Sequence, residues 1–214
     1  MAAKGLFVTF EGTEGVGKST QLKEAASTLE KLGVDYLVTR EPGGTPMAEK
    51  IRELLLAPRE EAVHETTELL LMFAARAQHL HNKILPALEQ GKWVLCDRFT
   101  DATFAYQGGG RGVSPERIAL LEALVQGDTR PDHVILLDAP VETGMARARK
   151  RGELDRFEQE DLEFFQRIRN AYLARATARP GQYHVVNAEL PLEQVSGSVS
   201  ALLTALVSRS QAVG

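Results

Sequence analysis

The segment that most restricts how this chain can fold is a glycine-rich stretch close to its start. Gly12–Ser19 reads GTEGVGKS, which fits the pattern G-x-x-x-x-G-K-[ST]. It follows the β-rich run Leu6–Phe10 and overlaps the start of Lys18–Leu32, where apolar residues recur at helical spacing. In such a strand–loop–helix unit, glycines let backbone N–H groups turn towards phosphate oxygens, and the positive end of the helix points at them. We therefore expect Gly12–Ser19 to bind phosphates, and we call it the phosphate loop.

The side chains of the phosphate loop suit a nucleoside triphosphate. Lys18 is placed to reach the β- and γ-phosphates, and the hydroxyl group of Ser19 is placed to bind Mg²⁺. The residues expected at the triphosphate are Gly12, Thr13, Glu14, Gly15, Val16, Gly17, Lys18, Ser19 and Thr20. A glycine-rich turn that only caps a helix is the weaker interpretation, because the loop lies between a strand and a helix.

Strand and helix patterns alternate along the rest of the chain. Further strands are expected at Val34–Val38, Trp93–Cys96, His133–Leu137 and Tyr183–Val186. Helices are expected at Met47–Leu56, Thr66–Leu88, Pro115–Val125, Val141–Lys150, residues 158–176 and Pro191–Val207, with a bend near Pro86 and a break at residues 108–110. This alternation predicts an α/β fold with a mainly parallel sheet. Because the sequence contains no internal repeat or linker, residues 1–214 are expected to form a single domain.

Composition narrows the class of protein. Lys and Arg total 25 against 29 Asp and Glu, a net charge of −4, which disfavours a general electrostatic interaction with nucleic acid. The positive residues divide into 17 Arg and 8 Lys, and arginine is the side chain best suited to bidentate phosphate contacts. The single cysteine, Cys96, excludes an intramolecular disulfide and indicates a reducing compartment. With no apolar run of ~20 residues and no signal peptide, a cytoplasmic protein that does not enter a membrane is expected.

Charged residues follow several of the expected strands at their carboxyl ends, where a parallel sheet binds its ligands. Asp97 and Arg98 follow Trp93–Cys96; Asp97 would hold Mg²⁺ directly or through water, and Arg98 would bind a second phosphate. Arg40, in the segment TREPGGT, would face the same cleft, and Asp138 is the second candidate for the metal. Without the phosphate loop, an ordinary salt bridge would be the better interpretation of Asp97 and Arg98.

An arginine interrupts the apolar stripe of the long expected helix. Arg76 lies three residues after Phe73, on the side that also carries Leu69, Leu80 and Ile84. A charge on an apolar stripe either pairs with a buried carboxylate or faces a ligand. Phe73 offers a flat surface and Arg76 offers hydrogen-bond donors, a combination that suits a planar base. Both a structural ion pair and a base contact remain open for Arg76.

A cluster of basic residues occupies the segment of about residues 147–157. Its members are Arg147, Arg149, Lys150, Arg151 and Arg156, interrupted by Gly152 and Asp155. Arg147 and Arg151 are four residues apart, where like charges on a helix repel. We interpret the segment as a small lid whose arginines neutralise charge on a transferring phosphoryl group. A solvated helix face is the alternative interpretation.

Four motifs together make the chain resemble the bacterial thymidylate kinase family. They are GTEGVGKST, REPGGT, the Asp97-Arg98 strand end and AYQGGGRG, and the resemblance extends through ELDRFE at residues 153–158 to the final helix. It implies a five-stranded parallel sheet of the P-loop NTPase-like kind, with helices on both faces and a small arginine-rich lid. It also implies transfer of the γ-phosphoryl group of ATP to dTMP, giving dTDP and ADP in dTTP biosynthesis, with Mg²⁺ and a homodimer.

The resemblance further implies roles for individual residues. For catalysis these are Lys18, Arg98, Arg151 and Arg156, with Arg149 in the same lid, and for Mg²⁺ Ser19 and Asp97. For dTMP they are Glu14 near the sugar 3′-hydroxyl group, Arg40 and Arg98 on the 5′-phosphate, Phe73 stacked on thymine, Arg76 at its edge, Thr103 and Gln107 nearby, and Tyr106 where a ribose 2′-hydroxyl group would lie. The alternatives are a P-loop ATPase or GTPase that acts as a switch, in which REPGGT and the pair Phe73 and Arg76 would have no role, and a kinase of another small acceptor.

Overall fold

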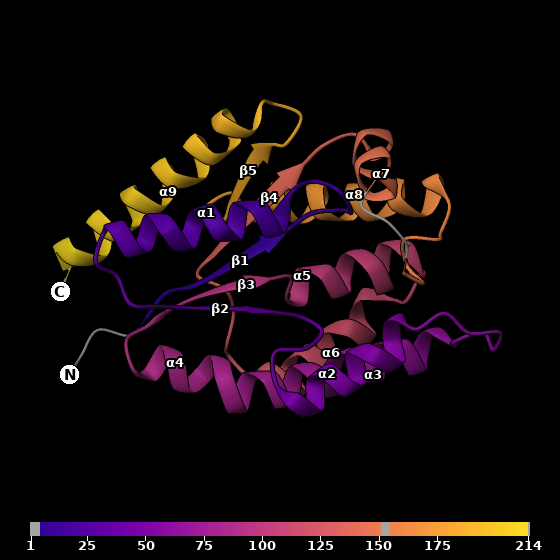
Figure 1. The fold of residues 1–214 in the computed structure, drawn as a ribbon. Helices are drawn as coiled ribbons and strands as arrows, with labels where there is room; N and C mark the ends of the chain where they lie inside the picture. The colour runs from indigo at the N-terminus through magenta and orange to yellow at the C-terminus, as the bar shows by residue number, and fades with distance from the viewer. Residues whose placement is uncertain (1–4, 151–154, 214) are drawn as a thin grey trace.

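The strands lie together in one parallel sheet in the computed structural model, which describes residues 5–150 and 155–213. Within these residues the strand order is β2-β3-β1-β4-β5, and every pair of neighbours is parallel (Figure 1). The strands are β1 (Phe7–Glu11), β2 (Tyr36–Arg40), β3 (Trp93–Asp97), β4 (His133–Asp138) and β5 (Tyr183–Asn187). The predicted α/β fold with a five-stranded parallel sheet is confirmed.

Helices connect the strands in the described parts of the chain. The α-helices are α1 (Lys18–Lys31), α2 (Pro46–Leu56), α3 (Glu65–His79), α4 (Leu85–Glu89), α5 (Thr100–Thr103), α6 (Pro115–Gln126), α7 (Val141–Arg149), α8 (Leu162–Ala178) and α9 (Leu192–Val213). Two π-helical segments, η1 (Leu80–Ile84) and η2 (Phe104–Gly110), follow α3 and α5. Among these described helices, none has both the length and the apolar character that crossing a membrane requires.

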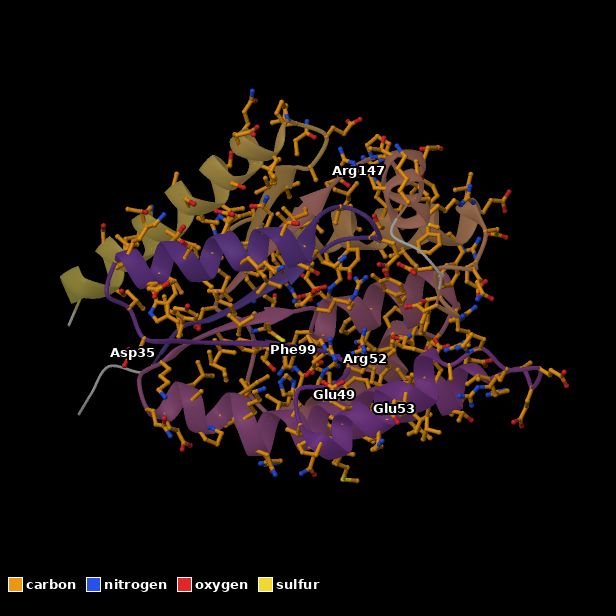
Figure 2. The ribbon with its side chains drawn as sticks, in the orientation of Figure 1. Asp35, Glu49, Arg52, Glu53, Phe99 and Arg147 are labelled. Carbon is orange, nitrogen blue, oxygen red and sulfur yellow. The ribbon has the colours of Figure 1, made fainter. Side chains whose placement is uncertain are left out.

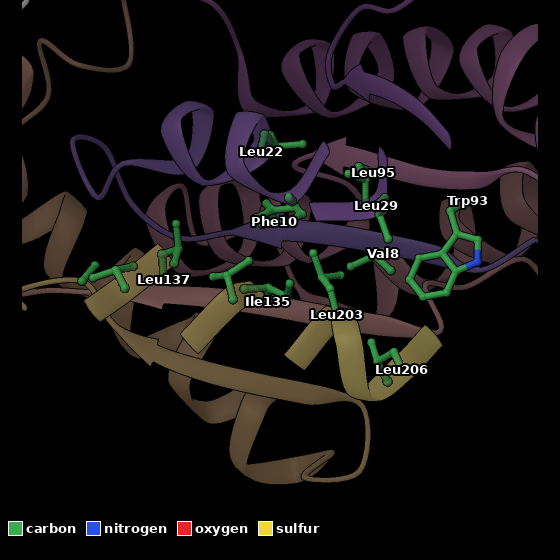
Figure 3. Packing of buried hydrophobic residues seen from close by; sticks show 14 of the residues in the cluster. Val8, Phe10, Leu22, Leu29, Trp93, Leu95, Ile135, Leu137, Leu203 and Leu206 are labelled. Atoms are coloured by element: carbon green, nitrogen blue, oxygen red, sulfur yellow. The ribbon is translucent and has the colours of Figure 1, made fainter. Parts of the chain in front are cut away.

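Helices cover both faces of the sheet because successive side chains of a strand point to opposite sides. In β1, Val8 and Phe10 point to the face covered by α1 and α9, where they pack with Leu29 and Leu203 (Figure 3). Phe7 points to the opposite face, which carries η1 and α4. Coverage on both faces explains why the central strands are almost entirely apolar.

The second strand lies two residues later than the sequence pattern predicts. β2 begins at Tyr36 rather than Val34 because its pairing with β3 starts with Tyr36 opposite Trp93. Arg40 is consequently the last residue of β2 and lies opposite Asp97 of β3. The register therefore places two predicted site residues side by side at the carboxyl edge of the sheet.

The three glycines at residues 108–110 do not break the helix, contrary to the prediction. They form the end of η2, where α8 packs against Gly109 and Gly110. A Cβ atom on Gly109 would lie 2.8 Å from the Cβ atom of Ala171, and one on Gly110 would lie 2.5 Å from the ring of Phe164. Gly109 and Gly110 are needed here because α8 approaches the backbone of η2 closely.

The long helix predicted over Thr66–Leu88 is divided into three parts. α3 continues into the π-helical segment η1, and α4 begins only after it. Pro86 lies in the first turn of α4, where a missing backbone N–H group costs least. The interruption is thus close to Pro86, as predicted, but it is a π-helical turn before the proline.

Candidate active site

The phosphate loop joins the end of β1 to the start of α1, as the sequence predicts. Gly15 has φ = 69°, and a Cβ atom there would lie 1.8 Å from the carbonyl oxygen of Gly144 in α7. Gly12 has φ = 137°, and its Cβ atom would lie 2.4 Å from the carbonyl oxygen of Leu137 in β4. Any side chain at either position would be strained and would collide with backbone. The loop therefore keeps its shape through close packing against β4 and α7.

Lys18 is held inside the phosphate loop by the loop's own backbone. Its Nζ donates hydrogen bonds to the carbonyl oxygens of Gly12, at 3.0 Å, and Thr13, at 2.6 Å. Burial and, secondarily, the positive charge of Arg98 lower the pKa of Lys18 to about 8, although Glu14 opposes the shift. An anionic ligand in the loop would favour the charged ammonium form, so phosphate binding and protonation of Lys18 are coupled.

A cavity of about 580 Å³ lies at the carboxyl edge of the sheet. Figure 2 labels three residues of its wall, Arg52 of α2, Phe99 after β3 and Arg147 of α7. The predicted site residues on this wall are Glu14, Gly15, Gly17, Lys18, Ser19, Thr20, Arg40, Arg76, Asp97, Arg98, Thr103, Tyr106 and Gln107. The remaining phosphate-loop residues, Gly12, Thr13 and Val16, are buried behind it. The fold therefore gathers most of the predicted site residues around one space.

Arg98 ties the end of β3 to the phosphate loop. Its backbone has φ = 66°, the left-handed region that is costly for a residue with a side chain. The guanidinium group forms an ion pair with Glu14 and donates to the carbonyl oxygen of Gly12 at 2.8 Å. Burial works against its charge, but Glu14 raises the pKa of Arg98 well above the ordinary arginine value. Tyr106 completes the group by donating its hydroxyl hydrogen to Glu14 at 2.8 Å.

A third arginine, Arg52 of α2, lines the cavity together with Arg40 and Arg98. Burial and then the charge of Arg40 lower the pKa of Arg52, with a smaller contribution from Arg98. Three neighbouring positive groups that repel one another are typical of a site for a multiply charged anion. The sequence contained a signal for Arg52, which is a charge on an apolar helix stripe. Arg52 lies four residues after the buried Ala48 of α2, and Arg76 occupies a similar position on the apolar stripe of α3.

Arg76 forms the buried ion pair that its position on an apolar stripe left open, and it also lines the cavity. Its Nε donates to Glu41 at 2.7 Å, and its NH2 donates to the carbonyl oxygen of Phe99 at 3.1 Å and to Thr103 at 2.9 Å. The NH1 group is buried and finds no hydrogen-bond partner among the described residues. Arg76 also lines the cavity, so the ion pair orients a guanidinium group that still has donors available.

A buried hydrogen-bond chain supports Arg76 from the REPGGT motif. Glu41 accepts from Arg76 and also from Nδ1 of His79, at 3.1 Å. A carboxylate only accepts, so Nδ1 of His79 donates to it, while Nε2 of the ring and the hydroxyl group of Thr39 are hydrogen-bonded at 2.7 Å. A Cβ atom on Gly44 would lie 2.4 Å from Nε2 of His79. Glu41 and His79, which sequence reasoning did not single out, therefore connect the motif to the cavity.

The structure separates the arginines that the sequence grouped as a lid. Arg147 lines the cavity from α7, and Arg149 is exposed at the end of that helix. Arg151 lies outside the described residues, as does the rest of residues 151–154. Arg156 is not among the residues of the cavity wall, because its NH2 donates to Glu68 of α3 at 2.6 Å and its Nε to the carbonyl oxygen of Leu55 at 2.8 Å.

Comparison with known proteins identifies the family. The sequence model described as thymidylate kinase matches residues 10–199. The chain is 60% identical to the thymidylate kinase of Pseudomonas entomophila (strain L48), covering 96% of this chain and 98% of the relative. It is also 60% identical to that of Pseudomonas savastanoi pv. phaseolicola, covering 95% and 97%. The chain belongs to the thymidylate kinase family.

A solved structure agrees with this assignment. The crystal structure of thymidylate kinase from Ehrlichia chaffeensis superposes with a TM-score of 0.75 at 34% identity, and covers 94% of this chain and 99% of that one. Thymidylate kinases are phosphotransferases that convert dTMP to dTDP with ATP in dTTP synthesis, and this chain is a member of that class of enzyme. The P-loop NTPase-like fold and the resemblance based on the four motifs are confirmed.

The aromatic side chain expected to stack on the thymine base is not on the cavity wall. Phe73 is 2% exposed and packs with Leu69 and Ile118, while the guanidinium group of Arg76 lies 4.9 Å from its ring. Met72, one residue earlier, lines the cavity. Met72 and Arg76, four residues apart, share a helix face, whereas Phe73 is rotated about 100° from Met72. In this thymidylate kinase family member, the structure therefore does not place Phe73 where a base would stack on it.

The two candidate metal-binding carboxylates differ in their surroundings. Asp97 lines the cavity next to the phosphate loop. Asp138 instead accepts two hydrogen bonds from Arg169, at 2.7 and 2.8 Å, and is not among the cavity residues. This arrangement favours Asp97, the first choice from the sequence.

Glu11, at the end of β1, is a buried carboxyl group that the sequence did not reveal. It accepts hydrogen bonds from the backbone N–H of Phe99, at 2.7 Å, and from the hydroxyl group of Tyr172, at 2.9 Å. Burial and then the negative charge of Asp101 raise the pKa of Glu11 to about 8. Glu11 thus joins β1 to the turn that carries Arg98, and its contribution to the free energy of unfolding depends on pH.

The raised pKa of Glu11 predicts how stability changes with pH. The carboxyl group of Glu11 binds its proton more tightly in the folded state than in the unfolded state, where its pKa is the ordinary 4.5. Protonation of Glu11 therefore contributes its full stabilisation below pH 4.5, and this stabilisation is lost as the pH rises towards 8. Glu11→Gln removes this dependence. We compare the free energy of unfolding of Glu11→Gln with that of the unchanged protein at each pH. From pH 5 to pH 8, we expect this difference to shift in favour of the variant by about 2–4 kcal/mol. Urea unfolding at both pH values measures this, and a constant difference would contradict the assignment.

Proposed function

We propose that the cavity is where the γ-phosphoryl group of ATP is transferred to dTMP, with the thymine base against Arg76. The observation that carries this assignment is the NH1 group of Arg76, which is buried without a hydrogen-bond partner among the described residues. A buried donor left unpaired is costly, and a carbonyl oxygen of a pyrimidine base would satisfy it. Glu41 and Thr103 hold the other nitrogens of the same guanidinium group, so the donor is oriented before the base arrives.

Met72 takes the packing role in this proposal that the family resemblance implied for Phe73. Its thioether lies on the cavity wall and on the helix face of Arg76. Methionine is polarizable and makes favourable contacts with aromatic rings, so it suits a flat base. Gln107 and Thr103 line the same cavity and offer further polar contacts.

The dTMP phosphate would lie among Arg40, Arg52 and Arg98. Mutual repulsion between these groups is relieved when a dianionic phosphate binds, which supports the placement. Glu14 and Tyr106, which are hydrogen-bonded to each other at 2.8 Å, would lie beside the sugar. In this position the phenol ring of Tyr106 would fill the place of a 2′-hydroxyl group and favour a deoxynucleotide.

The triphosphate of ATP would occupy the phosphate loop, where Lys18 exchanges its loop carbonyl partners for phosphate oxygens. Ser19 and Asp97 offer hard oxygen donors on the cavity wall and would hold Mg²⁺, which neutralises phosphate charge when bound. The described residues contain no group of three or more His, Cys, Asp or Glu side chains that could hold a metal. This fits an ion that keeps its waters and binds mainly through phosphates.

The reaction itself requires positioning more than a protein nucleophile. An oxygen of the dTMP phosphate attacks the γ-phosphorus atom while the bond to the β-phosphate oxygen of ATP breaks. Lys18 and Arg98 would stabilise the charge that develops on the transferring group. Arg147 lines the same cavity, and the proposal gives Arg151 the same role, although that residue lies outside the described part of the chain.

Release of ADP from ATP, measured with each deoxynucleoside monophosphate in turn, tests the proposed reaction. We expect strong stimulation by dTMP and little by the purine nucleotides, whose larger base would have to occupy the place proposed for thymine. Arg76→Met, which keeps the volume but removes the donors, should raise the KM for dTMP. Absence of stimulation by dTMP would overturn the proposal and favour a kinase of another acceptor.

We also propose a homodimer formed through α2, α3 and α6, which lie side by side (Figure 1). Of the ten exposed large apolar side chains among the described residues, these helices carry five, which are Met47, Leu54, Leu70, Leu120 and Leu124, between 52% and 78% exposed. A hydrogen bond of 2.8 Å between Arg117 and Thr66 joins the outer surfaces of α3 and α6. Exposed apolar side chains gathered on neighbouring helices are typical of an interface between subunits.

Leu124→Glu is expected to convert the dimer to a monomer. The new charge would be buried without a partner at the interface, twice in a symmetric dimer. Light scattering after size exclusion should then give the chain mass of 23.5 kDa. Leu192→Glu, which places the same charge on α9, serves as a control that should remain dimeric. A monomeric wild-type protein would contradict the proposal.

We propose a single domain, supported by the packing of α1, near the start of the chain, against α9 at its end. We propose that the enzyme acts in the cytoplasm, where ATP is available and where the one buried free thiol, Cys96, stays reduced.

A further inference from the structure

Glu68 of α3 is a buried carboxylate that connects two walls of the cavity. Its side chain is 1% exposed. Oε1 accepts a hydrogen bond of 2.9 Å from Nε2 of Gln107 and lies 3.5 Å from Nε of Arg111. Oε2 accepts one of 2.6 Å from NH2 of Arg156. The single buried carboxylate of Glu68 thus contacts Gln107 of η2, Arg111 directly after η2, and Arg156 further along the chain.

On one side, Glu68 fixes the orientation of the side-chain amide of Gln107. A carboxylate only accepts hydrogen bonds, so the NH2 group of Gln107 must point to Glu68 and the carbonyl oxygen must point elsewhere. Gln107 is 1% exposed and lines the cavity. The orientation of a polar group at the acceptor site is therefore set by Glu68.

On the other side, Glu68 anchors residues 155–160. Arg156 donates its NH2 to Glu68 and its Nε to the carbonyl oxygen of Leu55, and its guanidinium group lies 4.4 Å from the ring of Phe157. Arg111 adds a second link, with NH1 2.6 Å from Glu160. Asp155 and Phe157 of this segment line the cavity, so the anchor positions part of its wall.

We propose that Glu68 is a positioning residue that couples Gln107 at the acceptor site to the segment 155–160 through Arg156. Arg156 then acts as the anchor of this wall. The family resemblance had instead implied that it contacts the transferring phosphoryl group. The inference rests on the proposed function, because it concerns the binding of dTMP in the same cavity. Its electrostatic basis is independent of that function, because removing one partner of a buried ion pair leaves the other charge uncompensated.

Steady-state kinetics of Glu68→Gln, Arg156→Gln and the double variant test the coupling. We expect each single change to raise the KM for dTMP about tenfold with a much smaller change in kcat and in the KM for ATP. Because both remove the same contact, the double variant should be little worse than either single one. Glu65→Gln, three residues earlier on α3 and 43% exposed, is the matched control and should resemble the unchanged enzyme.

Two kinetic outcomes would overturn the inference. One is a loss of kcat of about 100-fold or more in Arg156→Gln with an unchanged KM for dTMP, which would mean that Arg156 contacts the transferring group. The other is a double variant whose KM is the product of the two single effects. If Glu68→Gln lowers the thermal midpoint too far for assay, Arg156→Gln alone still decides through its division between KM and kcat.

Hydrogen–deuterium exchange without nucleotide separates this inference from the proposed function. Faster exchange of the backbone amides of residues 155–160 in both single variants, but not in Glu65→Gln, would support the anchor even if dTMP proved not to be the acceptor. Exchange identical to that of the unchanged enzyme would overturn the anchor even if dTMP kinase activity were demonstrated.

Discussion

Lys18→Ala is expected to lower kcat for phosphoryl transfer about 10²–10³-fold or more, the scale on which removing one preorganised donor reduces catalysis. In the structure the ammonium group is buried inside the phosphate loop on the carbonyl oxygens of Gly12 and Thr13. No other lysine lines the cavity among the described residues, so a neighbouring lysine cannot replace it. Single-turnover measurement with saturating ATP and dTMP reports the transfer step directly.

Lys23→Ala, on an outward position of the same helix, is the control for loss of one positive charge and should keep near-normal kcat. The pKa of about 8 adds a second measurement, because Lys18 must take up a proton to bind the triphosphate once the pH exceeds that value. The affinity of the unchanged enzyme for ATP should therefore fall as pH rises above 8. A Lys18→Ala enzyme with ordinary kcat would show that the loop backbone alone supports transfer.

Arg98→Ala is expected to lower kcat/KM for dTMP about 10²–10³-fold, as truncation of one partner of a buried charge pair commonly does. The change removes a cation from the group that includes Arg40 and Arg52, and it also removes the ion pair of Glu14. The KM for dTMP should rise and turnover should fall together, because Arg98 contacts both the acceptor phosphate and the phosphate loop in the proposed complex.

The control for Arg98→Ala is Arg130→Ala, an arginine whose side chain is 34% exposed and which does not line the cavity. Isothermal titration with dTMP separates binding from turnover, and the thermal midpoint shows whether the loss of the Glu14 ion pair unfolds the protein. An unchanged KM and rate in Arg98→Ala would mean that the end of β3 has only a structural role.

Sequence reasoning succeeded where function depends on near neighbours in the chain. The phosphate loop was recognisable because glycine conformation, helix start and lysine position are all local properties of Gly12–Ser19. Arg40, Asp97 and Arg98 could be predicted to meet because parallel strands place their carboxyl ends at one edge of the sheet. Even the two-residue error in β2 did not separate Arg40 from Asp97, which lie opposite each other in the register.

Residues whose position depends on helix rotation were harder to predict. The pattern of α3 showed that Phe73 and Arg76 share an apolar stripe, but a stripe is wide enough to include both the core and the cavity. The rotation of α3 in the fold turns Phe73 towards Ile118 and Met72 towards the cavity. Arg52 was missed for the same reason, since its helix pattern alone does not show which edge of the stripe meets a ligand.

Contacts between distant segments were accessible only from the tertiary structure. Glu68 and Arg156 are 88 residues apart, and Glu11 and Tyr172 are 161 apart, so no local pattern relates them. The sequence by itself determined the sheet, the phosphate loop and the arginines at the strand ends, because these follow from periodicity and from strand direction. The tertiary structure alone decided that Arg156 pairs with Glu68, that Met72 faces the cavity and that Glu11 is buried, because those outcomes depend on how helices pack across the sheet.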